Sequence, residues 1–358
     1  MSEERQKPST SFSLNRLEPE LVSRLAAARS GDQLEFGRLT EPHRHELQVH
    51  CYRLLGSLHE AEDLVQETML RAWRRLDTFE GRASFRAWLY KIATNACLDA
   101  LDKRRRRSLP MSTRPPADPH QPLDPPLSDS AWLEPLPNDL VAAADENPEA
   151  RYTLRESVTL AFLAALQTLP PRQRAVLILR DVLDWRASET ANCLELTVSA
   201  VNSALHRARV TLAKHYHGQG QKAVQPSLDE PTGALLSRYL HAWEAADVDA
   251  LVGLLKEDAA LAMPPIPSWY RGREAIRLIL LAIPFAGAAT GRWRLLATRA
   301  NSQPALALYQ QDEAHGATYR GVGLQVLTID GDLVSAVTVF MNPDLLPRFG
   351  LPMTLSFF

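Results

Sequence analysis

The sequence predicts a multidomain protein with two all-α domains followed by a C-terminal α+β domain. Apolar residues recur at helical spacing through residues 34–107 and again through residues 151–217. Residues 108–150, which hold ten of the 25 prolines and no glycine, separate these two segments and favour an extended linker. Near the C-terminus, alternating apolar residues on both sides of Asp330-Gly331 predict a β-hairpin. A chain of 358 residues is long enough for these three domains.

Composition narrows the class of protein further. Hydrophobic residues make up 45% of the chain and charged residues 23%, as in ordinary globular proteins. No apolar run approaches the ~18 residues of a membrane span, and the polar first residues lack a signal-peptide core, so we predict a cytoplasmic protein. Cys51, Cys97 and Cys193 form no CxxC pair and are expected to be buried and reduced. We expect no metal and no cofactor.

The net charge of −2 conceals a strong segregation along the chain. Residues 71–107 carry eleven Lys/Arg against four Asp/Glu, whereas residues 108–150 carry one Arg against eight Asp/Glu. A basic segment that leads directly into an acidic one indicates a polyanionic partner.

The predicted organisation has six parts. They are an N-terminal extension (1–33), a first helical domain (34–107), an acidic proline-rich linker (108–150), a second helical domain (151–217), a short linker (218–230) and the C-terminal domain (231–358). In the C-terminal domain we expect helices first, over about 232–246, 248–255 and 273–283, and an antiparallel sheet after them. The linker contains one aromatic island, Trp132-Leu133-Glu134-Pro135, which is expected to dock on a domain.

The helix around residue 65 has a polar stripe opposite its apolar face. The stripe comprises Asp63, Gln66, Glu67, Leu70 and Arg74. Carboxylates of this kind can accept paired hydrogen bonds from arginines of a partner protein. A merely solvated acidic face is the simpler interpretation of this stripe taken alone.

The following helix, for which Ser84 is the predicted N-cap, carries a different surface. Away from the core it presents Trp88, Lys91, Asn95 and Asp99, and it ends in the basic run Lys103–Arg107. An aromatic ring can stack on unpaired bases, while amide and basic groups contact base edges and phosphates. The alternative is that Trp88 belongs to the core and that the basic run is solvated.

Residues 187–215 fit a helix-turn-helix. Two short helical patterns meet at a turn near Glu195-Leu196. The second helix then offers a polar face to a major groove, formed by Ser199, Asn202, Ser203, His206, Arg207 and Arg209.

These residues resemble a known family. The stretch AEDLVQETMLRAWRRLDTFEGRASFRAWLYKIATNACLDALDKRRRR resembles region two of extracytoplasmic-function (ECF) sigma factors, in the sigma-70 family of RNA polymerase sigma factors. The stretch LPPRQRAVLILRDVLDWRASETANCLELTVSAVNSALHRAR resembles their region four. The resemblance implies a non-enzymatic protein that binds core RNA polymerase, through its β′ and β subunits, and promoter DNA, and directs strand opening and transcription initiation.

The resemblance also implies roles for individual residues. Contact with the polymerase β′ coiled coil falls on Asp63, Leu64, Val65, Gln66 and Glu67. The melted minus-ten strand falls on Arg82, Ser84, Trp88, Lys91, Asn95 and Asp99. The minus-thirty-five duplex falls on Thr197, Ser199, Asn202, Ser203, His206, Arg207 and Arg209. The linker is implied to thread through polymerase toward the RNA exit path.

The chain departs from this family pattern in the helix-turn-helix. Family members commonly have glycine in the turn, where this chain has Glu195, and often have basic residues in place of Asn202 and Ala204. We therefore expect Glu195 to adopt a backbone conformation that favours glycine, and we expect fewer phosphate contacts from the second helix.

The C-terminal segment is similar to SnoaL-like cone-shaped α+β domains, through LLSRYLHAWEAADVDALVGLLKEDAALAMPP and WYRGREAI. A subset of ECF sigma factors carries this domain as a regulatory extension, and WLEP and FMNPDLLPRFGLP resemble that subset. The tail residues Asn342, Pro343 and Asp344 are accordingly expected to regulate activity in cis.

Two alternatives stay open from the sequence. The C-terminal domain could instead be a working small-molecule enzyme fused to a sigma-like DNA-binding protein, with an unidentified small ligand in its pocket. Candidate pocket residues are Tyr239, Trp243, Met263, Trp269, Tyr270, His315 and Phe340. The chain could also be a helix-turn-helix repressor with a ligand-binding domain, but a repressor does not need the stripe at Asp63 or the surface at Trp88.

Overall fold

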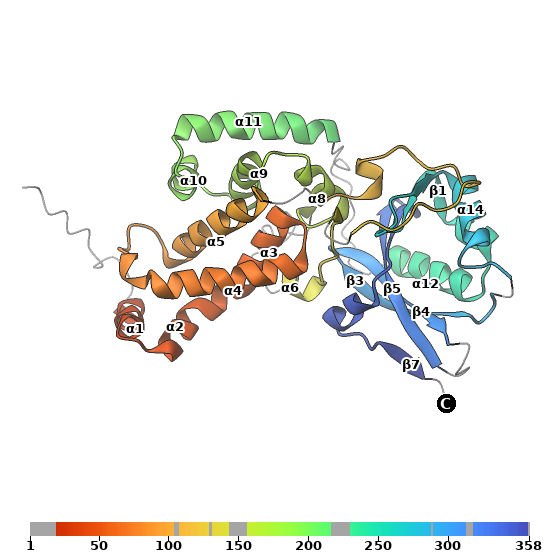
Figure 1. The fold of residues 1–358 in the computed structure, drawn as a ribbon, viewed down its shortest axis with the longest axis horizontal. Coiled ribbons are helices and arrows are strands. Elements are labelled where there is room, and N and C mark those ends of the chain that lie inside the picture. The colour runs from red at the N-terminus through yellow and green to blue at the C-terminus, as the bar shows by residue number, and fades with distance from the viewer. Residues whose placement is uncertain are drawn as a thin grey trace, which may run out of the picture.

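The structure, a computed structural model, describes residues 19–103, 107–128, 131–142, 156–215, 230–287, 289–312 and 318–356. Figure 1 shows the helical domains on one side of the molecule and the domain that contains the sheet on the other. None of the helices within the described ranges is both long and apolar enough to cross a bilayer.

The first helical domain consists of five helices whose starts follow the local sequence. They are α1 (Pro19–Arg29), α2 (Gln33–Thr40), α3 (Arg44–Leu55), α4 (Leu58–Arg74) and α5 (Phe85–Leu101). Ser57 caps α4 through the Glu60 amide, and Ser84 caps α5 through the Ala87 amide, as predicted for Ser84. Helix α1, within the predicted N-terminal extension, buries Leu25 and Ala28 in the same core as this domain.

The second helical domain also follows the sequence closely. It contains α8 (Leu160–Gln167), α9 (Pro171–Leu177), which continues as a π-helical turn (Ile178–Val182), α10 (Ala187–Leu194) and α11 (Val198–His215). The helix-turn-helix therefore occupies the predicted residues. A short helix, α6 (Asn138–Ala142), precedes it in the linker. The residues expected to begin this domain, 151–155, lie outside the described part of the chain.

The C-terminal domain combines three helices with a seven-stranded sheet. The helices are α12 (Glu230–Glu244), α13 (Val248–Gly253) and α14 (Arg273–Ala282). The strands are β1 (Leu255–Ala262), β2 (Trp269–Arg271), β3 (Trp293–Ala300), β4 (Gln303–Gln311), β5 (Thr318–Asp330), β6 (Leu333–Phe340) and β7 (Thr354–Ser356), with a 3-10 segment, η7 (Pro343–Phe349), before β7.

The order of strands is β2-β1-β6-β5-β4-β3, and β7 pairs with β5. A hairpin joins β5 to β6 as predicted, although its two turn residues are Gly331 and Asp332, because Asp330 still pairs with Leu333. Two expectations were wrong: β1 and β2 precede α14, and β1 runs parallel to β6, so the sheet is mixed. Residues 255–262 alternate too weakly in hydrophobicity to reveal β1 from the sequence.

The two faces of this sheet have different partners. On β5, Leu327 belongs to the core beneath α12 to α14, whereas Leu324 and Val326 belong to the core shared with the helical domains. This division follows the two-residue period of a strand. Residues of one sheet face therefore join the core of the helical domains, together with the tail segment η7.

Candidate functional site

Helix α4 presents the predicted acidic stripe to solvent. The Asp63 side chain is 62% exposed, and Gln66 and Leu70 are also exposed. Glu67 accepts a hydrogen bond from Arg71 Nε at 2.7 Å. Val65 is only 2% exposed and lies in the core beneath the stripe. Leu64 is half-buried.

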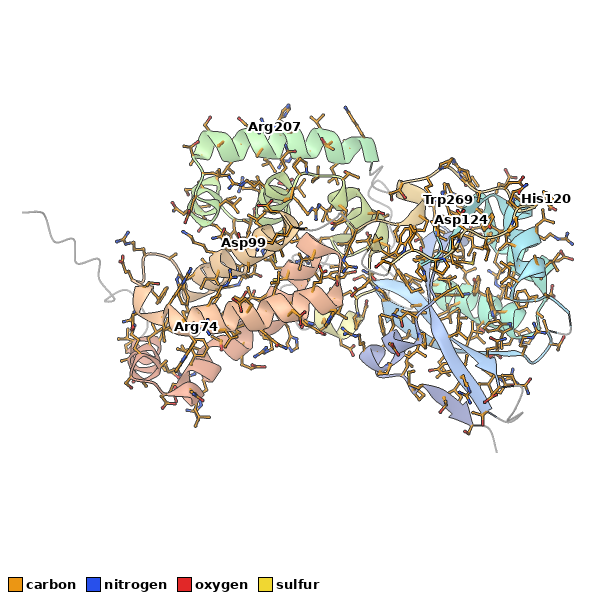
Figure 2. All side chains as sticks on the ribbon, viewed as in Figure 1. Arg74, Asp99, His120, Asp124, Arg207 and Trp269 are labelled. Atoms are coloured by element: carbon orange, nitrogen blue, oxygen red, sulfur yellow. The ribbon has the colours of Figure 1, made fainter. Side chains whose placement is uncertain are left out.

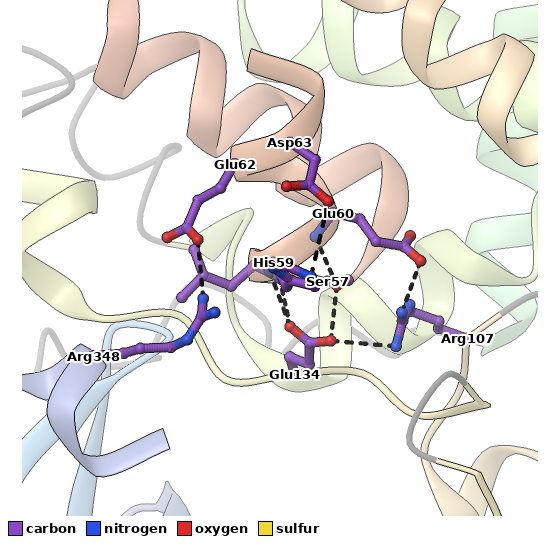
Figure 3. Close-up of polar contacts among 9 residues, drawn as sticks. Ser57, His59, Glu60, Glu62, Asp63, Arg107, Glu134 and Arg348 are labelled. Carbon is purple, nitrogen blue, oxygen red and sulfur yellow. Dashed lines mark hydrogen bonds and ion pairs between the residues drawn. The ribbon is translucent and has the colours of Figure 1, made fainter. Parts of the chain in front are cut away.

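The N-terminus of α4 is capped by the linker (Figure 3). The Glu134 carboxylate accepts hydrogen bonds from the Ser57 hydroxyl at 2.8 Å and from the backbone amides of Leu58 and His59 at 2.9 and 3.2 Å. A carboxylate at this position satisfies free amides and complements the positive end of the helix dipole. The aromatic island of the linker thus docks on the first helical domain.

Arg107 joins the same cluster from the end of the predicted basic run. Its guanidinium donates to the Trp132 carbonyl and to the Glu60 carboxylate, each at 2.9 Å, and lies 3.4 Å from Glu134. Arg107 is 7% exposed, so it anchors the linker and is not available to a phosphate. Residues 104–106 lie outside the described part of the chain.

The C-terminal tail reaches α4 as well. Asn342 accepts a hydrogen bond from the Asp344 amide and caps η7, which begins at Pro343. Near the end of η7, Arg348 forms an ion pair with Glu62 of α4 at 3.1 Å (Figure 3). Glu62 directly precedes Asp63 of the acidic stripe, so the tail touches the edge of that surface.

Helix α5 carries the second predicted surface. Trp88 is half-buried against Phe79 and Phe85, with ring centroids 5.4 and 5.6 Å away. Asn95 is half-buried, and Asp99 is exposed and lies 3.7 Å from Arg71 of α4. The Ser84 hydroxyl is used as the N-cap, and Arg82, in the preceding loop, is exposed and paired with Glu80.

Part of the α5 surface is covered by the second helical domain. Lys91 forms an ion pair with Glu195, in the helix-turn-helix, at 3.0 Å. Next to it, Tyr90 packs on Trp185 with ring centroids 5.4 Å apart. Burial raises the pKa of the Cys193 thiol to about 12, although a hydrogen bond with Thr94 acts to lower it. The thiol therefore stays protonated where the two domains meet.

Helix α11, in contrast, has an open outer face (Figures 1 and 2). Its inner face buries Val201, Ala204, Leu205 and Ala208. The predicted DNA-contacting residues are all exposed, and they are Thr197, Ser199, Asn202, Ser203, His206, Arg207 and Arg209.

Two residues on α11 have notable surroundings within their own domain. Arg209 makes a two-pronged ion pair with Asp181, at 2.7 and 2.8 Å, and is therefore partly occupied within its own domain. Ala204 is buried on the inner face of the helix.

The turn before α11 contains the predicted unusual backbone. Glu195 has φ 56° and ψ 45°, in the left-handed region, where glycine is favoured. The side chain that replaces glycine here is the one that reaches Lys91.

The two helical domains also share a buried interface. Arg53 of α3 donates to the Ser157 hydroxyl at 2.9 Å, and Arg174 of α9 donates to the Leu54 carbonyl. Both arginines are essentially inaccessible to solvent. Buried guanidinium groups require such partners, so separating the domains would rehydrate these groups.

Asn301, which the sequence did not single out, connects all three domains. Its amide donates to the Tyr52 hydroxyl and to the Val158 carbonyl, both at 2.7 Å, and accepts from the Leu136 amide at 2.9 Å. Asn301 is fully buried and has φ 55°, a conformation that asparagine tolerates better than most residues. An asparagine after a strand was the only available signal.

Tyr52 completes this connection. Its hydroxyl donates to the Glu134 carbonyl at 2.7 Å while it accepts from Asn301. Burial raises the pKa of the Tyr52 hydroxyl well above its usual value, so it remains a neutral donor. One buried hydroxyl therefore links the first domain, the linker and the C-terminal domain.

The candidate pocket residues of the C-terminal domain are divided among different surroundings. Tyr239 and Trp243 line a small cavity whose other walls are aliphatic: Leu251, Leu255, Leu261, Ile276, Leu280 and Val337. Trp269 contacts the linker, Phe340 lies on the opposite sheet face, and His315 lies outside the described residues. The remaining two, Met263 and Tyr270, belong to the core beneath the helices. The cavity walls contain no acid–base pair.

The three domains match three known families. Residues 39–107 match Sigma-70 region 2, residues 159–212 match Sigma-70 region 4, and residues 236–337 match the SnoaL-like domain. The fold and its exposed helix faces thus define a two-domain transcription initiation factor with a C-terminal extension.

Similar proteins extend this result to the whole chain. The ECF RNA polymerase sigma factor SigG of Mycobacterium tuberculosis is 46% identical over 331 residues, which cover 92% of this chain and 86% of that protein. SigW of Bacillus subtilis is 28% identical over 55% of this chain and 97% of its own length. The crystal structure of M. tuberculosis SigJ, 21% identical, shares the fold with a TM-score of 0.55 and covers 89% of this chain and 99% of its own.

The chain belongs to the ECF sigma factors of RNA polymerase. Such factors are non-enzymatic subunits that bind core polymerase and promoter DNA and direct transcription initiation. The first and second helical domains are accordingly called region 2 and region 4 below.

Proposed function

We propose that the C-terminal domain regulates this sigma factor in cis by holding regions 2 and 4 in a closed arrangement. The observation that carries the proposal is the Asn301 connection, because one residue of the C-terminal domain bonds to region 2, to the linker and to Val158 at the start of region 4. The tail adds the ion pair between Arg348 and Glu62 beside the acidic stripe.

In this proposal the exposed surfaces have distinct partners. The α4 stripe, centred on Asp63 and Glu67, binds the polymerase β′ coiled coil. The α5 face around Trp88 holds the opened minus-ten strand, and α11 binds the minus-thirty-five duplex. The exposure of Asp63 and of the whole outer face of α11 supports these roles.

The closed arrangement affects these surfaces unequally. Lys91, on the α5 face, is paired with Glu195 of region 4 and cannot at the same time face a DNA phosphate. Opening regions 2 and 4 would free it. We therefore propose that the closed form has lower affinity for the minus-ten strand than the open form has.

The role of the α4 stripe can be tested by charge reversal. Asp63→Arg with Glu67→Arg should abolish binding to core polymerase, because both carboxylates are the proposed acceptors for partner arginines. Glu257→Arg with Glu274→Arg, two reversals on the exposed surface of the C-terminal domain, is the matched control. Thermal unfolding verifies the fold, and unchanged binding of the first variant would refute the assignment.

The regulatory role can be tested by run-off transcription with purified core polymerase. Arg348→Glu should change transcript yield from a cognate promoter, because it places two carboxylates together at Glu62. Adding Glu62→Arg should restore the original yield by reversing the pair. Arg320→Glu, which breaks a pair with Asp312 inside the C-terminal domain, is the control.

A chain that ends near Gln225 provides the coarse version of the same test. If that chain and the Arg348 variant both match the full-length protein in yield, regulation by the C-terminal domain is refuted.

A further inference from the structure

The proline-rich linker is folded back on itself into a loop with a closed base. The Ser108 amide donates to the Ala131 carbonyl at 3.0 Å, and the Leu133 amide donates to the Ser108 carbonyl at 3.1 Å. The base is fastened to region 2 by Arg107 and Glu134. Both ends of the segment 109–131 therefore meet at the N-terminus of α4, and the segment adds nothing to the distance between regions 2 and 4.

The far part of this loop lies on the C-terminal domain, beside β1 and α14 (Figure 1). The Ala117 amide donates to the Trp269 carbonyl at 2.7 Å, and the Leu127 amide donates to the Pro265 carbonyl at 2.9 Å. In the opposite direction, the Trp269 indole donates to the Arg114 carbonyl at 2.8 Å. The loop thus covers β2, which is the edge strand of the sheet.

Ser268 supplies the most specific part of this contact. Its hydroxyl accepts from the Asp124 amide and donates to the Asp124 carboxylate, both at 3.1 Å. Asp124 and Trp269 lie side by side in Figure 2. Ser268 and Trp269 are only 5% and 8% exposed, so the polar groups that face the loop are shielded by it.

The chemistry of this surface suits one kind of partner. Most of its bonds go to the backbone of the loop, which is extended and rich in proline, and one carboxylate is recognised by a hydroxyl. An exposed sheet edge offers such bonds to an added strand. Most linker side chains from 112 to 128 stay exposed, with Ala117 and Leu123 as apolar contacts, so the loop is held by a few bonds and can leave.

We infer that the segment Pro265 to Trp269, which leads into the edge strand β2 and is called the β2 edge below, is a reversible binding surface for the linker of this same chain and that the bound linker stores length between regions 2 and 4. Release of the base and the far part of the loop adds residues 109–131 to the tether. That segment spans up to roughly 80 Å at about 3.4 Å per residue. Enough chain then exists for region 4 to move away from α5. The inference deepens the proposed regulation in cis and rests on it.

The experiment uses the full chain without polymerase, so it can fail separately from the transcription tests. Hydrogen exchange of the segment 114–128 is measured by mass spectrometry in wild type, Ser268→Ala and Asp124→Ala. Each variant removes bonds between the loop and the β2 edge, and we expect about five-fold faster exchange of that segment. Asp118→Ala is the matched control, because the Asp118 carboxylate bonds only to the His120 amide inside the loop.

A second readout measures the stored length. Spin labels are placed at Asp77→Cys and Val210→Cys, two exposed positions in regions 2 and 4, while the native cysteines are buried. In Asp124→Ala combined with Glu134→Ala, which loosens both the far part and the base of the loop and leaves the C-terminal domain unaltered, the distribution of distances should gain a longer component. Exchange equal to that of Asp118→Ala would refute the binding surface, and faster exchange with an unchanged distribution would refute the storage of length.

Discussion

The two helices that we propose bind promoter DNA, α5 in region 2 and α11 in region 4, differ in how much of each is free. All seven predicted residues at α11 are exposed, whereas on α5 Lys91 is paired with Glu195 and Trp88 and Asn95 are half-buried. Region 4 packs on α5 through α10 and the turn, which pairs Lys91 and leaves the outside of α11 open, whereas Trp88 is half-buried within region 2 itself against Phe79 and Phe85.

If α5 and α11 have the proposed roles, the closed arrangement should affect one promoter element more than the other. In the proposed function, duplex binding by α11 needs only access to its outer face, whereas strand capture by α5 needs the interface between the regions to open. Under the proposed regulation in cis, the C-terminal domain would control strand opening and have little effect on duplex recognition. The following predictions test it from the largest expected effect to the smallest.

The largest effect is expected from Asn301→Ala. The substitution removes three buried hydrogen bonds and leaves the Leu136 amide and the Val158 carbonyl without partners, at a cost of about 2–5 kcal/mol. Exchange at the interface of regions 2 and 4 should accelerate, and affinity for a single-stranded minus-ten oligonucleotide should rise. Asp332→Ala, in the exposed β5–β6 turn, is the control. Unaltered exchange in Asn301→Ala would contradict the connecting role.

A second prediction concerns pH and the support of α5. Full burial, aided by the nearby Arg53 and Arg86, lowers the pKa of His50 from 6.5 to about 3, and its imidazole pairs with Thr94 of α5 at 2.9 Å. As the pH falls, His50 is therefore protonated in the unfolded chain before it is protonated in the folded one. The stabilising contribution is complete above pH 6.5 and is lost as the pH falls toward 3, with a loss of about 2 kcal/mol at pH 5.

Urea unfolding of wild type and His50→Gln at pH 7.5 and pH 5 measures this effect. The pH dependence should be smaller in the variant by about that amount. If the free energy of unfolding depended equally on pH in the two proteins, other groups would account for the acid sensitivity.

A third prediction separates two arginines on α11. Arg207 is exposed on the outer face (Figure 2), whereas Arg209 is paired with Asp181. Arg207→Ala should lower the slope of log affinity against log salt by about one for binding to a minus-thirty-five duplex by the holoenzyme. Arg209→Ala should change the slope less, since that charge is already partly neutralised. The reverse order would place the DNA on another face of the helix.

The smallest effect is expected at Glu195. Its ion pair with Lys91 is largely exposed and contributes at most about 1 kcal/mol. Glu195→Gln removes the charge, and Glu195→Gly also relieves the left-handed backbone. Both should raise minus-ten oligonucleotide affinity by about two- to five-fold, and only the glycine variant should also raise the stability of region 4. No change in affinity would show that the pair does not restrain α5.

Local patterns were sufficient for much of the fold. The Ser84 cap, the limits of α10 and α11, and the hairpin between β5 and β6 were all predictable, because each depends on residues within one or two turns of chain. The strand β1 was missed and the sheet was expected to be antiparallel, because the parallel pairing with β6 joins segments far apart in sequence.

For the candidate surfaces too, the sequence predicted local features and missed contacts between distant residues. The acidic stripe and the outer face of α11 follow from helical periodicity, and their exposure agrees with it. Burial of Val65 was visible in that period as well. The pairing of Arg209 with Asp181 and the burial of Arg107 were not, because each depends on a partner from another element.

By itself, the sequence determined the two helical domains, the helix faces that carry charge and the family to which the chain belongs, because periodicity and motif spacing are properties of neighbouring residues. Only the tertiary structure decided that Asn301 joins three domains, that Glu134 caps α4 and that the linker closes on itself. Those contacts join residues up to 249 positions apart, and their free energy arises from burial and hydrogen bonds that form only when the domains pack together.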